Sequence, residues 1–253
     1  MQFISAKVEG GLGTITLNRA PLNILNIKMM NEINDTLEDW TEDRGLKVVL
    51  FNANGKGFSS GVDVEEHMGD MASKMIESFH GMFRLMDSLG AVTVSSVYGS
   101  CLGGGCELSI FCDLVIADDT AKFGQPEIQL GVLPPIAAQI MPRIIGRKAA
   151  MDLILSGRII SAKEAMDMGL ITKVVAKGDL TKETDRFIKP YLSLSAEVIR
   201  VTKKAIKAGL IDDLEPSLKI IEDIYLKELM RTADAQEGLQ AFLERRSPEW
   251  KNC

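Results

Sequence analysis

The chain has 253 residues, 46% of them hydrophobic, and a formal net charge of −6 with a pI near 5.1. This length can bury a large core, whereas the acidic balance argues against nucleic-acid binding, which needs clustered Lys and Arg. The sequence shows no leader pattern, no long apolar span, no metal-ligand spacing and no C-x-x-C pair among its four cysteines. We therefore expect a cytoplasmic protein without a membrane partner or a metal site.

The first two-thirds of the chain alternate between strand and helix patterns. Residues 3–8 and 13–17 read as short strands around a glycine turn. From Asn26, a candidate N-cap, apolar residues follow a helical period as far as Trp40. Stretches 46–53, 91–99 and 113–124 are apolar and of strand length, which suits strands buried on both faces. This alternation predicts an α/β fold.

Beyond about residue 146 the pattern becomes mainly helical. Residues 146–157 read as a helix closed by Gly157, residues 161–169 as another capped by Ser161, and residues 170–176 as one more strand. No strand signal follows residue 181, and no flexible linker precedes the helical end. We expect an α/β core over residues 1–190 with a C-terminal helical region, residues 191–253, packed on it.

The stretch CLGGGCELSIFCD, residues 101–113, sets three glycines before a glutamate. A helix beginning near Gly104 or Gly105 has unpaired N–H groups and the positive end of its dipole at its start. Those groups could polarise a carbonyl oxygen and stabilise an enolate-like charge, with Glu107 beside it. A tight strand-to-helix connection with a structural glutamate fits the same pattern. Phosphate and dinucleotide loops are disfavoured, because their glycine spacings are missing.

Two further stretches extend this pattern. GKGFSSGVDVEE, residues 55–66, follows a strand and places small residues where a second backbone amide could reach a ligand. FGQPEIQLGVLPP, residues 123–135, puts Glu127 behind a proline that fixes its local backbone. In order and interval, the three stretches resemble the motifs of the enoyl-CoA hydratase/isomerase family, the crotonases. The resemblance extends from TLNRAPLN near the start to AFLERRSPEWK near the end.

This resemblance implies a fold, an assembly and a reaction. The fold would be a crotonase-type spiral of repeated ββα units with a C-terminal helical oligomerisation region, forming a homotrimer or homohexamer. The amides of Val62 and Gly104 would form an oxyanion hole for the thioester carbonyl of an acyl-CoA. Glu107 and Glu127 match the paired carboxylates that move protons during hydration of an α,β-unsaturated acyl-CoA. The sequence leaves open which glutamate is the acid and which the base.

Coenzyme A would enter as part of the substrate, so the resemblance implies no separate cofactor. Family positions that contact the substrate correspond to Ala20, Leu22, Val62, Asp63, Val64, Glu65, Gly104 and Pro135. The family usually has a lysine where this chain has Glu65, so the phosphate contacts should differ. Arg19, Lys56 and the C-terminal Arg245 and Lys251 are candidates for those contacts, or ordinary surface side chains.

The main departure from the family pattern is Pro135. Hydratases of straight-chain substrates usually have a glycine there, and proline has no N–H to offer the attacking water. With PLNILN and GVLPPIAA, the chain is similar to the branch that acts on cyclic dienoyl-CoA thioesters, such as cyclohexa-1,5-diene-1-carbonyl-CoA. A double-bond isomerase of the same fold and a non-catalytic CoA-thioester-binding subunit remain alternatives. His67 and His80 lack a nucleophile or metal partner at recognisable spacing and should be structural.

Overall fold

A computed structural model describes residues 1–210, 220 and 223–253. Its larger sheet has six strands in the order β1-β2-β3-β4-β6-β9, in which β1 and β2 are antiparallel and all other neighbours are parallel. The strands expected over residues 3–8, 13–17, 46–53, 91–99 and 170–176 are all present. The strands are β1 (Ile4–Glu9), β2 (Leu12–Leu17), β3 (Val48–Ala53), β4 (Val92–Val97), β6 (Leu114–Asp118) and β9 (Lys173–Val175).

A second sheet contains three short strands, β5 (Ser100–Leu102), β7 (Lys122–Gly124) and β8 (Ile159–Ser161), in the order β5-β7-β8. The single strand expected over residues 113–124 is therefore wrong, because β6 and β7 belong to different sheets. The break lies where Asp118 Oδ1 accepts a hydrogen bond from the Thr120 backbone N–H at 2.9 Å. This side-chain contact belongs to the turn in which the chain leaves the first sheet.

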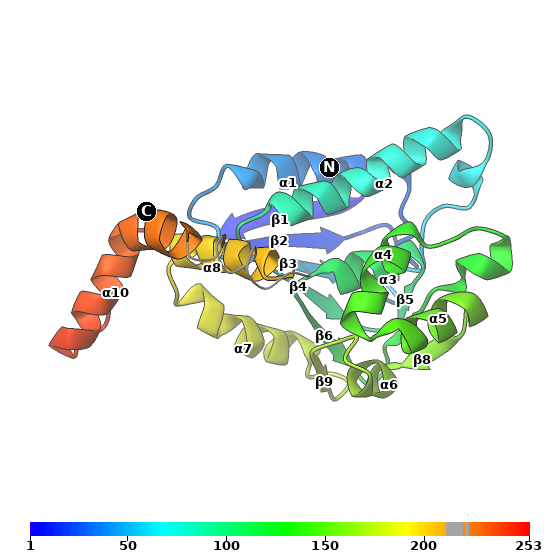
Figure 1. Ribbon diagram of the computed structural model, residues 1–253. Helices are drawn as coiled ribbons and strands as arrows, with labels where there is room; N and C mark the ends of the chain where they lie inside the picture. Colours follow the sequence, from blue (N-terminus) through cyan, green and yellow to red (C-terminus); the bar gives the residue numbers. More distant parts are fainter. Residues whose placement is uncertain (211–219, 221–222) are drawn as a thin grey trace.

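Helices cover both faces of the larger sheet (Figure 1). One face packs against α1 (Ile27–Thr41), α2 (Met71–Ser88) and α3 (Gly104–Phe111), and this interface contains the main hydrophobic core. Asn26 caps α1 as expected, since its Oδ1 accepts from the Met29 amide at 3.0 Å. The other face packs against α7 (Leu180–Leu192) around a smaller cluster that contains Leu50, Val94 and Ile188.

The chain also contains shorter helical elements. They are η1 (Glu65–His67), η2 (Pro126–Leu130), α4 (Pro135–Ile144), α5 (Arg147–Ser156) and α6 (Ala162–Asp167). Two expected caps are confirmed: Gly157 ends α5 in the left-handed region at φ 64°, and the Ser161 side chain accepts from the Glu164 amide. Strand pairs followed by a helix recur along the chain, as in β1-β2-α1 and β4-β5-α3.

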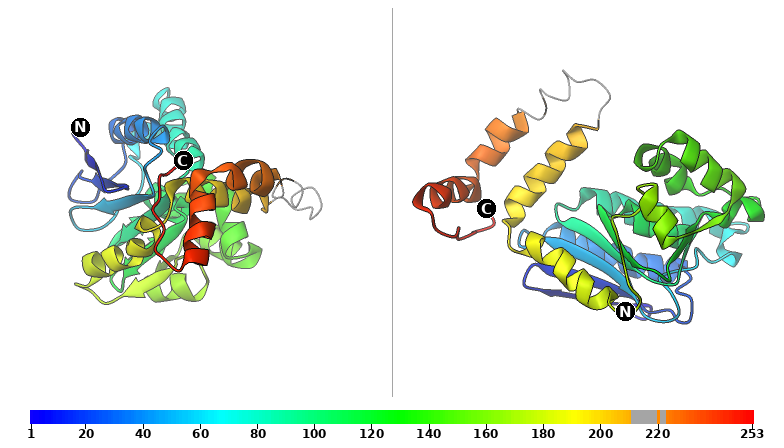
Figure 2. Two further views of the ribbon diagram at one scale, coloured as in Figure 1. Left: turned by 90° about the vertical axis from the view of Figure 1, so that its left-hand side faces the viewer. Right: turned by 90° about the horizontal axis from the view of Figure 1, so that it is seen from below.

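The C-terminal part begins beside the starts of β4 and β6, where Lys203 donates to Ala91 O and forms an ion pair with Asp113, and its later elements extend away from the sheets (Figure 2). Its described elements are α8 (Ala196–Ala208), η3 (Ile224–Glu228), η4 (Leu229–Arg231) and α10 (Ala233–Glu244). The buried Asp234 carboxylate accepts from the Ser195 hydroxyl and from the Lys251 and Asn252 amides, so the chain end returns to the start of α8. A domain boundary near residue 190 stays a prediction. Within the described residues, no helix has the length and apolar character that a membrane crossing requires.

Candidate active site

The glycine-rich stretch forms the turn from β5 into α3. Gly103 has φ 52°, which favours glycine, and its N–H donates to Gly124 O at 3.0 Å. Gly104 begins the helix, and its own N–H donates no hydrogen bond among the described residues. A Cβ on Gly104 would lie 2.5 Å from Val62 Cγ2 and 3.1 Å from the Phe79 ring. No side chain fits at this position without displacing a neighbour.

The second predicted amide, that of Val62, lies in the loop beside this turn. On either side of it, Leu25 N donates to Gly61 O and Asp63 N donates to Leu25 O, both at 2.8 Å. The Val62 N–H itself donates to no acceptor in the described parts of the chain. A Cβ on Gly61 would lie 4.0 Å from Gly104 N, so the two loops are in contact. The fold thus brings together the two amides predicted for the oxyanion hole.

Glu107 lies in the first turn of α3 and is 2% exposed. Its Oε1 accepts from the Ile136 and Ala137 amides at 2.7 and 2.8 Å, in the first turn of α4. Burial raises the pKa of Glu107 to about 8, the charge of Glu127 adds to the rise, and the two backbone hydrogen bonds oppose it. The N-terminus of α4 thus anchors the Glu107 carboxyl group, which lies 29 residues before Ile136 in the sequence.

Glu127 lies in η2 and approaches the same turn from the other side. A Cβ on Gly103 would be 2.9 Å from Glu127 Oε1, so this carboxyl group lies directly over the residue before Gly104. Burial raises the pKa of Glu127 to about 7. With its amide oriented to form hydrogen bonds, the fully buried Gln125 places Nε2 3.2 Å from both carboxyl oxygens of Glu127.

The two glutamates form a pair suited to proton transfer. Glu107 is buried and Glu127 is half-buried, each has a pKa raised into the range of neutral pH, and neither forms an ion pair with any described residue. Repulsion between two carboxylates disfavours ionisation of both, so near neutral pH the pair retains one proton. The site can therefore offer an acid and a base at the same time.

Pro135 occupies the first position of α4, directly after Pro134. A missing N–H costs nothing there, because the first amides of a helix have no partner within the helix. The next two amides, those of Ile136 and Ala137, are directed at Glu107. Pro135 therefore lies beside the anchor of a predicted catalytic carboxyl group, and its contact with substrate stays a prediction.

The predicted coenzyme A contacts lie in two adjoining loops. Ser60 N donates to Leu22 O and Lys56 N donates to Pro21 O, which joins the loop of Ala20 and Leu22 to the loop that ends in η1. Val64 and Glu65 are exposed there.

The charged groups in these loops pair with each other. Asp63 forms an ion pair with Arg19 at 3.3 Å, its Oδ1 accepts from the Glu65 amide, and Arg19 also donates to Ile24 O. Arg19 is thereby paired within the protein, whereas Lys56 is exposed and forms no ion pair with any described residue.

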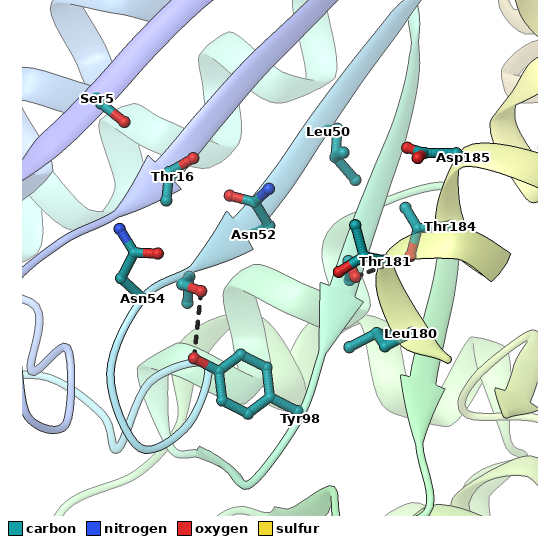
Figure 3. Close-up of a pocket in the computed structure, with 12 residues that line it drawn as sticks. Ser5, Thr16, Leu50, Asn52, Asn54, Tyr98, Leu180, Thr181, Thr184 and Asp185 are labelled. Atoms are coloured by element: carbon teal, nitrogen blue, oxygen red, sulfur yellow. Dashed lines mark hydrogen bonds between the residues drawn. The ribbon is translucent and has the colours of Figure 1, made fainter. Parts of the chain in front are cut away.

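A polar cavity of about 380 Å³ lies on the opposite face of the larger sheet (Figure 3). It is lined by side chains such as Asn52, Ser96 and Tyr98. Neighbouring residues of β4 point to opposite faces: Ser95 Oγ bonds to Ser109 of α3, while Ser96 Oγ lies 2.9 Å from Thr184 Oγ1 of α7. The sheet thus separates this cavity from α3 and Glu107.

Several groups in the site were missed by sequence reasoning. Gln125 is adjacent to the proline that precedes Glu127, and this position beside a predicted catalytic glutamate was the available signal. Asn23 and Ser59 are both fully buried and connect the loops around Val62. Their contacts join segments 36 residues apart, which no local pattern indicates. The described residues contain no group of three or more His, Cys, Asp or Glu side chains arranged to hold a metal ion.

Comparisons with known proteins agree with this geometry. The profile of the enoyl-CoA hydratase/isomerase family matches residues 7–253. The chain belongs to the enoyl-CoA hydratase/isomerase family. It is 37% identical to the cyclohexa-1,5-dienecarbonyl-CoA hydratase of Thauera aromatica over 96% of this chain and 94% of that protein. It is 32% identical to the crotonyl-CoA hydratase of Syntrophomonas wolfei, with 94% of each chain covered.

The fold agrees with the same family. The crystal structure of enoyl-CoA hydratase from Bacillus anthracis superposes with a TM-score of 0.94 at 31% identity, covering 100% of both chains. The expected α/β crotonase fold is therefore confirmed. The assignment of individual site residues in this family member rests on the geometry above and stays a prediction.

Proposed function

We propose that this protein is an enoyl-CoA hydratase that adds water to an α,β-unsaturated acyl-CoA thioester. The observation that carries the proposal is the convergence of the buried Glu107 and the half-buried Glu127 carboxyl groups on a turn with two amides that donate to no acceptor among the described residues. A double-bond isomerase needs one group to move a proton, whereas hydration needs one to activate water and one to protonate carbon. Relatives named as hydratases support the same reaction.

The reaction would proceed through an enolate-like state. The thioester oxygen accepts hydrogen bonds from the Val62 and Gly104 amides, which stabilise the negative charge that develops on it. The ionised carboxylate removes a proton from water as the water oxygen bonds to the β-carbon. The protonated carboxyl group gives its proton to the α-carbon, so the product gains one water and the pair retains one proton. Coenzyme A is part of the substrate, and we propose that no further cofactor takes part.

The acyl group is proposed to be cyclic. Two lines support a substrate such as cyclohexa-1,5-diene-1-carbonyl-CoA. One is the Thauera aromatica relative, and the other is Pro135, which offers no amide to water where straight-chain hydratases have a glycine. Coenzyme A would lie along the loops of Ala20, Leu22 and Val64. Backbone N–H and C=O groups would provide most of its contacts there, because these loops offer few unpaired charged side chains.

We also propose a homotrimer or homohexamer in the cytoplasm, assembled through the C-terminal helices. An apolar groove of about 960 Å³ runs beside α8, and it is lined by side chains such as Ile144, Ile206 and Leu210. Leu210 is 72% exposed in the single chain, and a large exposed apolar patch is typical of an interaction surface. Light scattering on the purified protein tests the assembly.

Oxygen labelling tests the reaction. The protein would be incubated in ¹⁸O-labelled water with crotonyl-CoA and, separately, with cyclohexa-1,5-diene-1-carbonyl-CoA, and the products weighed by mass spectrometry. A hydratase gives a hydroxyacyl-CoA that contains the label. An isomerase gives a product of unchanged mass, and a binding subunit gives no product; either result would reject the proposal.

A further inference from the structure

Ser59 lies where the two loops of the proposed oxyanion hole meet. Its side chain is completely buried. Its backbone joins the second sheet: Ser59 N donates to Ser100 O at 3.0 Å, and Leu102 N donates to Ser59 O at 2.9 Å. The residue is therefore fixed to β5, the strand that leads directly into the Gly103 turn.

The Ser59 hydroxyl ties this strand to the other loop. Its Oγ donates to Asn23 O at 2.7 Å and accepts from Gly61 N at 3.3 Å. Gly61 immediately precedes Val62, so the hydroxyl holds the peptide next to the proposed amide donor. Water offers the Ser59 hydroxyl, Gly61 N and Asn23 O no alternative partner, because all three residues are buried.

Asn23 gives the hydroxyl a rigid acceptor. It is fully buried with φ 49°, a conformation that non-glycine residues rarely adopt. Its Nδ2 donates to Asn54 O at 2.6 Å and to Gly57 O at 3.0 Å, and its Oδ1 accepts from Arg19 N. The carbonyl that receives the Ser59 hydroxyl is thus held by three hydrogen bonds of the same residue's side chain.

The Ser59 side chain also touches the start of α3. A Cβ on Gly105 would lie 2.5 Å from both Ser59 Cβ and Ser59 Oγ, so the first turn of the helix rests on this side chain. One small residue therefore contacts Gly61 on one side and Gly105 on the other. These glycines are the neighbours of Val62 and Gly104, whose amides donate to no acceptor among the described residues.

We propose that Ser59 is a positioning residue whose hydroxyl sets the spacing and direction of the Val62 and Gly104 amides. The inference rests on the proposed function, because it assumes that these amides bind the thioester oxygen. Ser59→Ala fills nearly the same volume but leaves Gly61 N and Asn23 O without a partner, and a buried unpaired group costs free energy unless it moves. Movement of the Gly61 peptide would turn the Val62 amide away from its target.

The carbonyl stretching frequency of a bound enoyl thioester reports on this geometry directly. Hydrogen bonds to the carbonyl oxygen lower that frequency, so infrared difference spectra of bound substrate analogue would be compared for wild type, Ser59→Ala and Ser96→Ala. Ser96 is a matched control, since it is a buried serine with one hydroxyl contact, to Thr184, on the far face of the sheet.

We expect Ser59→Ala to show a smaller frequency shift and a kcat lower by about 10- to 100-fold, below the effect of losing a whole donor. KM should change by less than about threefold, and Ser96→Ala should match the wild type in all three measurements. If Ser59→Ala shows the same carbonyl frequency shift as the wild type, the inference is overturned, whatever the thermal stability of the variant. If Ser59→Ala does not fold, Ser59→Cys serves instead, with a weaker donor of similar shape and an expected intermediate shift. A wild type with neither turnover nor a shifted carbonyl would reject the proposed function itself.

Discussion

Gln125 and Glu127 face each other across a single proline, with the Gln125 Nε2 3.2 Å from both carboxyl oxygens. Two N–H groups directed at a carboxyl group favour its ionised form and oppose the effect of burial. Gln125→Leu should therefore raise the pKa of Glu127 further. We expect the limb of the kcat/KM profile that reports this group to move upward by about one pH unit.

Gln129→Leu is the control, because Gln129 lies in η2 with Glu127 and its side chain donates to Gly157 O at 3.2 Å instead. Its pH profile should match that of the wild type. Glu107 is the charged group that faces Glu127 from α3, so the profile should also be measured in Glu107→Gln. An unshifted profile in Gln125→Leu would show that the amide does not bind the carboxylate.

The pH dependence of the wild type follows from the shared proton. The pKa values of about 7 for Glu127 and about 8 for Glu107 place the singly protonated pair mainly between these values. We expect a bell-shaped kcat/KM profile with its maximum between about pH 7 and 8.

Glu107→Gln and Glu127→Gln should each lose about 10²- to 10⁴-fold in kcat while remaining folded. Near wild-type hydration in both variants would rule out a two-glutamate mechanism.

Burial of Glu107 should also be visible in stability. Its pKa rises from 4.5 in a free side chain to about 8 in the folded protein, so the folded state binds the proton more tightly than the unfolded chain. This stabilisation is complete below about pH 4.5 and is lost as the pH rises towards 8. Glu107→Gln carries no such charge, so the Tm of this variant should rise relative to that of the wild type between about pH 4.5 and 8. Scanning fluorimetry from about pH 5 to 9 measures the difference, with the exposed Glu38→Gln as control. A difference in Tm that is constant with pH would contradict the buried, protonated state.

The sequence predicted the local features of the fold better than the long-range contacts of the site. Helical periodicity, the Asn26 and Ser161 caps and the Gly157 end all depend on a few neighbouring residues, and all are confirmed. The contact of Glu107 with α4 joins residues 29 and 30 positions apart, and it depends on how α4 packs. Periodicity carries no information about such packing, so the anchor could not be predicted.

Gly104→Ala tests the oxyanion hole. The new methyl group would overlap Val62 Cγ2 at 2.5 Å, so either the loop or the amide must move. Loss of one such donor typically raises the barrier by about 3 kcal/mol, which corresponds to a kcat lower by about 10²-fold. Steady-state kinetics should show a larger effect on kcat than on KM. Gly45→Ala is a suitable control, since the nearest atom there is the Asp43 side-chain oxygen at 3.3 Å. Equal losses in kcat and binding affinity would indicate a distorted loop instead.

Pro135→Gly tests whether the first turn of α4 selects the acyl group. The substitution adds an N–H directly before the amides of Ile136 and Ala137, which hold Glu107, and so supplies the donor that straight-chain hydratases have. Its stability cost should be about 1 kcal/mol or less, because the unfolded chain gains freedom. We expect the ratio of kcat/KM for crotonyl-CoA to that for cyclohexa-1,5-diene-1-carbonyl-CoA to rise. Pro134→Gly loosens the same loop one residue earlier, and it should leave the ratio unchanged if the position of the new amide is what matters. If the wild type already prefers crotonyl-CoA and Pro135→Gly keeps that preference, the cyclic-substrate proposal fails, and the protein is a hydratase of straight-chain substrates.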